Sequence, residues 1–181
     1  MAYPVKESKN REREIRSSLW RIRNQIKGGD ESELAVWVIP QKLACSQRPL
    51  RDHPTFGGYT PLPPKAKPLV IAWVERMKEI GFKSVICLLE DRQLDRYYVR
   101  GGLGLHQRGL LGYIESQGLE VRHFPTTDYQ RPSDELTEAA YKAWRQLPKP
   151  VLVFCSAAID RSTPVAAGIA KRESGGLEKL W

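Results

Sequence analysis

The chain has 181 residues, of which 41% are hydrophobic and 28% charged, with a mean hydropathy of −0.47; this composition is typical of one globular domain and excludes collagen-like, rod-like coiled-coil and disordered chains. The formal net charge of +8 indicates an anionic partner, but residues 1–27 hold eight basic and three acidic residues and so supply +5 of it. Because the rest of the chain is only mildly basic, the charge alone does not predict a nucleic-acid-binding fold.

Apolar runs and cysteines indicate the compartment. The longest mostly apolar run spans residues 151–159, whereas a membrane-spanning helix needs about 20 residues. The N-terminus lacks the apolar stretch of a secretory signal. The cysteines at positions 45, 87 and 155 form neither a disulfide framework nor a zinc-binding pattern. We therefore expect a cytoplasmic protein without a transmembrane segment, in a reducing compartment that keeps a nucleophilic thiol free.

A basic helix is predicted over residues 6–27, ending at the Gly28-Gly29 pair. Its apolar positions recur on one stripe, formed by Ile15, Leu19, Ile22 and Ile26. The stripe favours packing of this helix against the domain. The basic surface around the stripe leaves open a second interpretation, in which the helix binds an anionic surface or a partner. We define residues 1–33 as a basic helical N-terminal extension.

Short strands alternate with helices after this extension. Strands are predicted over residues 34–39, 42–45, 84–89, 119–124 and 150–154, and helices over residues 68–80, 134–147 and 161–172. Residues 47–64 are predicted to form a long loop rich in proline and glycine. Between residues 90 and 118, where glycine is frequent, we expect a loop and then a helix that ends before Gly118. The alternation predicts a single α/β domain with a central, mostly parallel sheet flanked by helices.

The stretch from Val151 to Thr163 carries the most chemistry, because it places Cys155 and Arg161 between a buried strand and the start of a helix. Backbone N–H groups of residues 156–161 can point into one concavity there, and the helix N-terminus adds positive potential, so the site suits an anion. The same potential favours the thiolate form of Cys155, which makes this cysteine a nucleophile. The planar guanidinium of Arg161 can hold two phosphoryl oxygens.

This strand, loop and helix resemble the phosphate-binding loop of the protein tyrosine phosphatase superfamily, whose pattern is H-C-x-x-G-x-x-R-[ST]. The resemblance implies that Cys155 is the nucleophile, that Arg161 clamps the phosphate, and that the Ser162 hydroxyl assists departure of the thiolate. It also implies chemistry without a metal or a cofactor. The implied phosphate-binding residues are Ser156, Ala157, Ala158, Ile159, Asp160 and Arg161.

Two further runs extend the resemblance toward the N-terminus. Residues 121–128 resemble the strand and loop that bring the general acid in the small dual-specificity phosphatases, which implies that Asp128 is the acid. Asp134 and Asp160 stay open as alternative acids. Residues 36–44 resemble the W-V-x-P-x-x-L-A run that is common in the small atypical members of this family.

Three features depart from the family pattern. Phe154 stands where the family has a histidine that supports thiolate formation, and Ala158 replaces a glycine near the bound phosphate. Few residues follow Arg161, although relatives add one or two further helices that cover the core. Either the chain is truncated, or the apolar stripe of the N-terminal helix takes over that covering role. Asp160, directly before the arginine, is similar to the loops of several phosphoinositide phosphatases.

The resemblance implies that residues 34–181 form a dual-specificity phosphatase-like catalytic domain. Such a domain hydrolyses phosphate monoesters through a phosphocysteine intermediate, on proteins that carry phosphotyrosine, phosphoserine or phosphothreonine, with phosphoinositides kept open. Two alternatives stay open as well. Phe154 and Ala158 are compatible with a phosphate-binding module of the same fold that lacks catalysis. A rhodanese-type sulfurtransferase also uses a loop cysteine below a helix N-terminus.

The histidines and the other two cysteines could in principle bind a metal or take part in redox chemistry, but we expect mainly structural roles for them. His53, His106 and His123 show no metal-ligand spacing, so we expect structural roles for them. Cys87 lies inside a predicted strand and is expected in the core. Cys45 is a further core candidate, with a redox partnership with Cys155 as the alternative.

Overall fold

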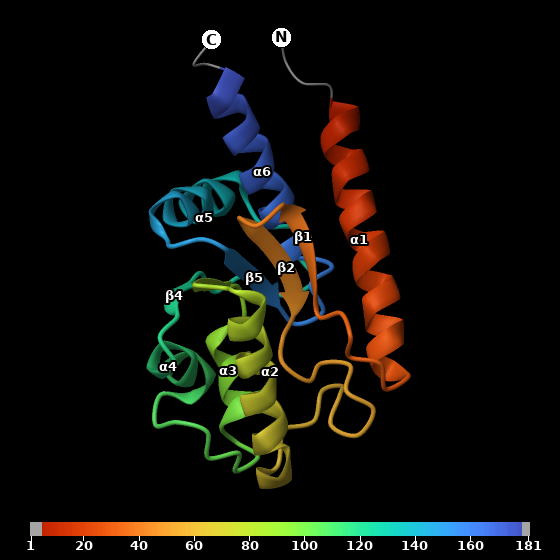
Figure 1. The fold of residues 1–181 in the computed structure, drawn as a ribbon, viewed down its shortest axis with the longest axis vertical. Coiled ribbons are helices and arrows are strands. Elements are labelled where there is room, and N and C mark those ends of the chain that lie inside the picture. Colours follow the sequence, from red (N-terminus) through yellow and green to blue (C-terminus); the bar gives the residue numbers. More distant parts are fainter. Residues whose placement is uncertain (1–4, 179–181) are drawn as a thin grey trace.

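A five-stranded sheet forms the centre of the fold (Figure 1). The computed structural model describes residues 5–178, with side chains from residue 9 to residue 175. In sheet order the strands are β1 (Ala35–Ile39), β2 (Leu43–Gln47), β5 (Val151–Cys155), β3 (Ser84–Cys87) and β4 (Glu120–His123). The first strand pairs antiparallel with the second, and the other pairings are parallel. The predicted α/β architecture with a mostly parallel sheet is confirmed.

Helices cover both faces of this sheet, which gives the domain two apolar clusters. On one face lie η1 (Pro64–Ala66), α2 (Lys67–Ile80), α3 (Asp91–Tyr98) and α4 (Gly109–Ser116). On the other face lie α1 (Val5–Lys27), α5 (Asp134–Gln146) and α6 (Ser162–Glu178).

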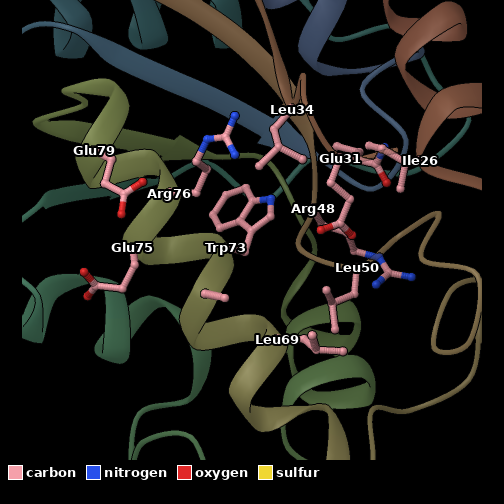
Figure 2. Close-up of a pocket in the computed structure, with 12 residues that line it drawn as sticks. Ile26, Glu31, Leu34, Arg48, Leu50, Leu69, Trp73, Glu75, Arg76 and Glu79 are labelled. Carbon is pink, nitrogen blue, oxygen red and sulfur yellow. The ribbon is translucent and has the colours of Figure 1, made fainter. Parts of the chain in front are cut away.

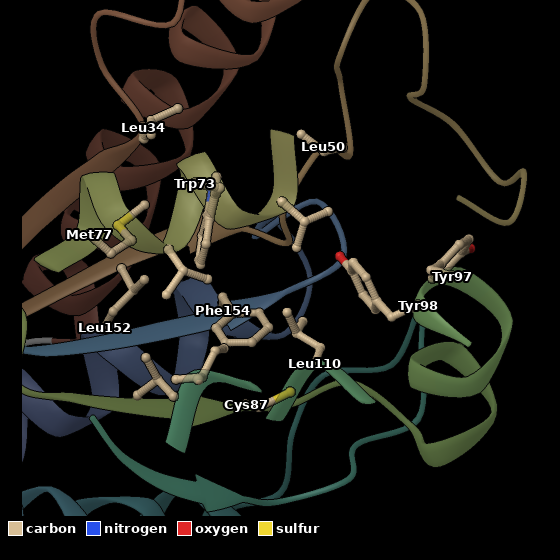
Figure 3. Packing of buried hydrophobic residues seen from close by; sticks show 14 of the residues in the cluster. Leu34, Leu50, Trp73, Met77, Cys87, Tyr97, Tyr98, Leu110, Leu152 and Phe154 are labelled. Atoms are coloured by element: carbon tan, nitrogen blue, oxygen red, sulfur yellow. The ribbon is translucent and has the colours of Figure 1, made fainter. Parts of the chain in front are cut away.

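Strand β5 contributes side chains to both clusters, because successive residues of a strand point to opposite faces. Leu152 and Phe154 belong to the cluster under α2, where Figure 3 shows Phe154 close to Trp73 and Leu152. Val153 and Cys155 belong to the cluster under α6. The strand that leads to the predicted nucleophile is therefore buried on both sides, as expected of a central parallel strand.

The expectation for residues 90–118 was wrong in one respect. A helix, α3, begins directly after the third strand, where we expected a loop. A reciprocal capping box nucleates it, since the Glu90 side chain accepts from the Gln93 backbone while the Gln93 side chain accepts from Glu90 N at 3.1 Å. Its eight residues are mostly polar, so hydrophobic periodicity does not reveal it. Helix α6 also extends beyond the predicted end at Arg172.

The apolar stripe of α1 packs on the domain, which is the first of the two roles predicted for this helix. Ile15 and Leu19 join the cluster under α6, and Ile22 and Ile26 reach the cluster under α2. This helix contacts α6 and β1, so it covers core surface beside the last helix of the chain (Figure 1).

The division of the chain into an N-terminal extension, residues 1–33, and a catalytic domain, residues 34–181, stays a prediction. Residues 1–4 of the extension and residues 179–181 of the domain lie outside the described residues. None of the helices within residues 5–178 combines the length and apolarity that crossing a bilayer requires.

Candidate active site

The loop between β5 and α6 lies at the carboxyl edge of the parallel strands and borders a pocket. Cys155 ends the strand, is 2% exposed, and its Sγ accepts a hydrogen bond from the backbone N–H of Ser162 at 3.4 Å. The pocket has a volume of about 330 Å³. Its floor is formed by Cys155, Ser156, Ala157, Ile159, Asp160 and Arg161. The structure therefore brings together the predicted nucleophile, the arginine and most of the predicted phosphate-binding residues.

Arg161 is fixed by hydrogen bonds from one of its nitrogens, whereas the other two make no hydrogen bond within the described residues. Its Nη1 donates to Gln93 Oε1 at 2.8 Å, Thr126 O at 3.0 Å and Leu88 O at 3.3 Å. Its Nε and Nη2 are buried and donate no aligned hydrogen bond. Because buried guanidinium nitrogens need acceptors, this free edge is a site for two oxygens of an anion.

Asp128 lies next to this free edge. Its Oδ1 is 3.1 Å from Arg161 Nη2, close enough for an ion pair although the two atoms lack the alignment of a hydrogen bond. Its Oδ2 accepts from Gln93 Nε2 at 3.1 Å. Among the alternative acids, Asp160 is exposed and also lines the pocket, whereas Asp134 begins α5 and does not line it. Asp128 and Asp160 are thus brought to the site.

Gln93 is a site residue that sequence reasoning missed. It is 8% exposed, and it links Arg161 to Asp128 through the two ends of one amide. The same oxygen caps the first turn of α3. The spacing of Glu90 and Gln93 was a usable signal for this helix start, since an acceptor followed three residues later by Gln is typical of a capping box.

The loop adopts a left-handed backbone at Ala158, with a φ of 72°. Its side chain is fully buried in the cluster under α6, and its carbonyl accepts from Thr163 N at 3.1 Å and Thr163 Oγ1 at 2.6 Å. Glycine adopts this region freely and alanine does so at a cost, so Ala158 stands at a position whose backbone favours glycine. The hydrogen bonds and the buried methyl group oppose that cost.

We predict that Ala158→Gly is nearly neutral for stability. A left-handed conformation costs a non-glycine residue about 1–2 kcal/mol, but glycine loses about 0.8 kcal/mol from a buried methyl and about 0.5–1 kcal/mol from chain entropy. The free energy of unfolding in urea should therefore change by less than about 1 kcal/mol. Ala158→Val should lower it by more than about 2 kcal/mol, because a β-branched residue fits neither the backbone nor the space. A gain above about 2 kcal/mol in the glycine variant would contradict this balance.

Phe154 packs away from the pocket. It is fully buried and meets the Trp73 ring edge-on, with ring centroids 6.0 Å apart (Figure 3). Since it lies in the cluster under α2, it does not share a face of the sheet with Cys155. The Ser162 hydroxyl, predicted to assist the departing thiolate, is buried and unpartnered within the described residues. Support for a thiolate therefore has to come from the Ser162 N–H, the start of α6 and Arg161.

The other cysteines and the histidines have structural surroundings. Burial raises the pKa of the Cys87 thiol to about 12 and lifts the pKa of Cys45 further above its ordinary range, so both are neutral thiols in the core. His53 and His106 accept backbone hydrogen bonds within their own turns, from Thr55 N at 3.0 Å and Arg108 N at 3.0 Å respectively, and the His123 ring contacts Leu89 O at 2.6 Å.

The walls of the pocket come from distant parts of the chain, and apart from Asp128 none of their residues was predicted from the sequence to belong to the site. They are formed by Trp20, Arg23, Arg51, Tyr59, Asp128 and Tyr129. Trp20 and Arg23 belong to α1, and Arg51 and Tyr59 belong to the long loop after β2. The aromatic side chains are exposed by 46%, 52% and 74% for Trp20, Tyr59 and Tyr129. An aromatic and cationic rim thus surrounds the thiol.

A second cavity of about 480 Å³ lies between α2, β2 and the end of α1 (Figure 2). Figure 2 shows Trp73 and Arg76 beside the acidic side chains of Glu75 and Glu79. None of its lining residues is a cysteine, serine, threonine or histidine. Although it is larger than the pocket at Cys155, it holds no candidate nucleophile.

Comparisons with known proteins find similarity in structure alone. No protein-family model matches the chain, and no curated protein matches it either. The crystal structure of Tk-PTP in the active form is similar, with 20% sequence identity and a TM-score of 0.42, over 69% of this chain and 63% of that chain. A mutant form of Tk-PTP is similar with 22% identity and a TM-score of 0.41, over 68% of this chain and 61% of that chain. The chain therefore spans less than two thirds of each of these structures.

Proposed function

We propose that the chain is a cysteine-dependent phosphatase that hydrolyses phosphate monoesters without a metal ion. The observation that carries the proposal is the arrangement of Cys155 and the free edge of Arg161 at one pocket, below the N-terminus of α6. A thiolate beside a fixed guanidinium edge and a helix N-terminus suits in-line attack on a phosphoryl group.

In the first step, Cys155 Sγ attacks phosphorus and forms a sulfur–phosphorus bond while the bond from phosphorus to the alcohol oxygen breaks. Arg161 Nε and Nη2 and the amides of residues 156–161 hold the equatorial oxygens, where charge is spread in the transition state. Asp128 gives its proton to the departing oxygen. Because Asp128 Oδ1 lies 3.1 Å from Arg161 Nη2, the incoming phosphate replaces the carboxylate at the guanidinium.

In the second step, water attacks the phosphocysteine and releases inorganic phosphate. Asp128, now ionised, takes a proton from that water, and the sulfur leaves as a thiolate. The Ser162 hydroxyl, which has no partner among the described residues, donates to the departing sulfur. The chemistry then returns the enzyme to its starting protonation state.

We place the substrates among phosphotyrosine, phosphoserine and phosphothreonine residues of proteins, with phosphoinositides as a further class, and the enzyme among the small atypical dual-specificity phosphatases. The exposed aromatic side chains at the rim suit contact with a segment of a substrate protein. We propose action in the cytoplasm, where reducing conditions preserve the thiol of Cys155.

The test is hydrolysis of para-nitrophenyl phosphate at mildly acidic pH with a metal chelator present. The intact chain should release nitrophenol, and Cys155→Ser should release none while inorganic phosphate still raises the melting temperature of both proteins. Cys87→Ser serves as the matched control, because it removes a buried thiol outside the pocket and should leave turnover in place.

Other outcomes lead to other functions. Stabilisation by phosphate without turnover in the intact chain would indicate a phosphate-binding module. Transfer of sulfur from thiosulfate to cyanide, with a persulfide on Cys155, would indicate a rhodanese-type sulfurtransferase.

A further inference from the structure

The segment that carries Asp128 is tied to helix α1 by an ion pair whose carboxylate, from Glu12, is buried and whose guanidinium, from Arg131, is exposed. Arg131, three residues after Asp128, donates from Nη2 to Glu12 Oε1 at 2.7 Å and from Nη1 to Glu12 Oε2 at 3.0 Å. Such a two-point contact fixes both the distance and the orientation of the two side chains. It joins residues that are 119 positions apart in the chain.

Glu12 is held in its charged form by this contact. It is 7% exposed and also accepts from Arg16 Nη2 at 3.2 Å. Burial by itself would raise the pKa of Glu12, but the hydrogen bonds and charges of Arg131 and Arg16 outweigh burial and hold its pKa below the ordinary value. A carboxylate with a lowered pKa keeps its stabilising contribution above the ordinary pKa and loses it as the pH falls through the lowered value. The pair is therefore intact in a mildly acidic assay.

The segment between Thr126 and Ser133 depends on side-chain contacts for its position. At the start of the segment, the backbone N–H of Thr126 donates a hydrogen bond to Leu88 O at 3.1 Å. From residue 127 to 132, the hydrogen bonds and ion pairs that the described residues make to other parts of the chain come from side chains: Asp128, Tyr129 and Arg131.

Those three side chains differ in how firmly they hold the segment. Asp128 has to change partners during catalysis, because it moves from Arg161 to the leaving oxygen. Tyr129 is 74% exposed and its hydroxyl lies 3.2 Å from that of Tyr59. Exposed contacts of this kind contribute little to position. The Arg131 side chain is also exposed, by 67%, but it makes two hydrogen bonds to a carboxylate that is only 9% exposed. This two-point contact on a buried, charged partner is thus the anchor that persists while Asp128 moves.

We propose that Glu12 is a positioning residue, and that its ion pair with Arg131 holds Asp128 within reach of the leaving oxygen. This inference rests on the proposed phosphatase function and deepens it, because it makes α1 part of the catalytic assembly. A loop that drifts by about 1 Å can cost a reaction about 10²-fold. The effect should fall on the proton-transfer step that Asp128 performs and not on phosphate binding.

The test compares two substrates that differ in their need for an acid. In Glu12→Gln, kcat/KM for phenyl phosphate should fall about 10-fold or more, because its leaving group needs a proton, while kcat/KM for 2,4-dinitrophenyl phosphate should change less than about 2-fold. The ratio kcat/KM is compared because it reports only the steps up to release of the leaving group and so omits hydrolysis of the phosphocysteine, in which Asp128 also acts. Arg131→Gln should show the same pattern, and the double variant should be no slower than either single variant.

The matched control lies on the same helix. Arg21 and Glu33 form an ion pair of equal geometry, with distances of 2.7 and 3.1 Å, but that pair is exposed and does not line the pocket. Glu33→Gln should leave both substrates unaffected. Equal losses on both substrates in Glu12→Gln, or no loss at all, would overturn the positioning role.

A second readout separates this inference from the proposed function. Amide hydrogen exchange over residues 127–132 should become faster in Glu12→Gln than in the intact chain, while exchange in β5 stays unchanged. This comparison needs no turnover. If the intact chain is inactive but exchange rises as expected, the anchor stands and the phosphatase proposal fails; unchanged exchange with an active chain overturns the anchor alone.

Discussion

Arg161→Lys should remove both phosphate binding and turnover. Lysine presents a single ammonium group, so it cannot fill the Nη1 contacts to Leu88, Gln93 and Thr126 and also offer two further donors to a phosphate. Loss of a fixed cationic donor from a transition state costs about 10³-fold or more. We expect kcat/KM for para-nitrophenyl phosphate to fall by at least that factor, and the thermal shift caused by inorganic phosphate to disappear.

The expected loss has to be separated from unfolding, because Arg161 is 1% exposed and its Nη1 contacts also join β3 to the Asp128 segment. Circular dichroism and the melting temperature of the variant in buffer establish whether it is folded. Arg108→Lys is the matched control, since its ion pair with Glu115 is exposed and lies outside the pocket. A folded Arg161→Lys variant that keeps phosphate binding would contradict the role given to the guanidinium edge.

Asp128→Asn should slow turnover and tighten phosphate binding at the same time. An amide cannot donate a carboxylic proton, and general-acid catalysis contributes about 10²–10⁴-fold. We expect a loss in that range for phenyl phosphate and a smaller loss for para-nitrophenyl phosphate. Because the Asp128 carboxylate lies 3.1 Å from Arg161 Nη2, it competes with phosphate for that nitrogen. Its replacement by a neutral amide should therefore lower the inhibition constant of inorganic phosphate.

The two effects are measured in one assay, from initial rates at several phosphate concentrations. Asp160→Asn is the informative comparison, because Asp160 also lines the pocket but is exposed and makes no ion pair with Arg161 among the described residues. An unchanged rate for phenyl phosphate in Asp128→Asn, with a loss in Asp160→Asn, would move the acid role to Asp160.

Local sequence was sufficient for the parts of the site that follow one another along the chain. The apolar run before Cys155 predicts a buried strand, and Arg161 and Ser162 mark the start of the helix that follows. A loop between a central parallel strand and the helix that follows lies at the carboxyl edge of the sheet, so the position of residues 156–161 follows from local sequence alone. The assignment of Asp128 as the acid rests instead on the resemblance of residues 121–128 to the strand and loop that bring the acid in the small dual-specificity phosphatases.

The residues that hold these groups in place could not be predicted in this way. Gln93 lies in a short polar helix, and its partners Asp128 and Arg161 are 35 and 68 positions away. The Glu12 and Arg131 pair depends on the angle at which α1 crosses the domain. The helical periodicity of α1 predicts which of its residues are buried and contains no information on which loop they meet. Likewise, an alanine does not by itself reveal a left-handed backbone; at Ala158 that conformation accompanies hydrogen bonds from Thr163 to its carbonyl.

The central claim is that a phosphoryl group passes through the sulfur of Cys155. The most direct measurement is peptide mass spectrometry after the intact chain is mixed with para-nitrophenyl phosphate, in the presence of a chelator, and quenched in acid during turnover. We predict one added phosphate on the peptide that contains Cys155, and none on the same peptide of Cys155→Ser. Release of nitrophenol with an unmodified Cys155, or equal release by Cys155→Ser, would contradict the mechanism.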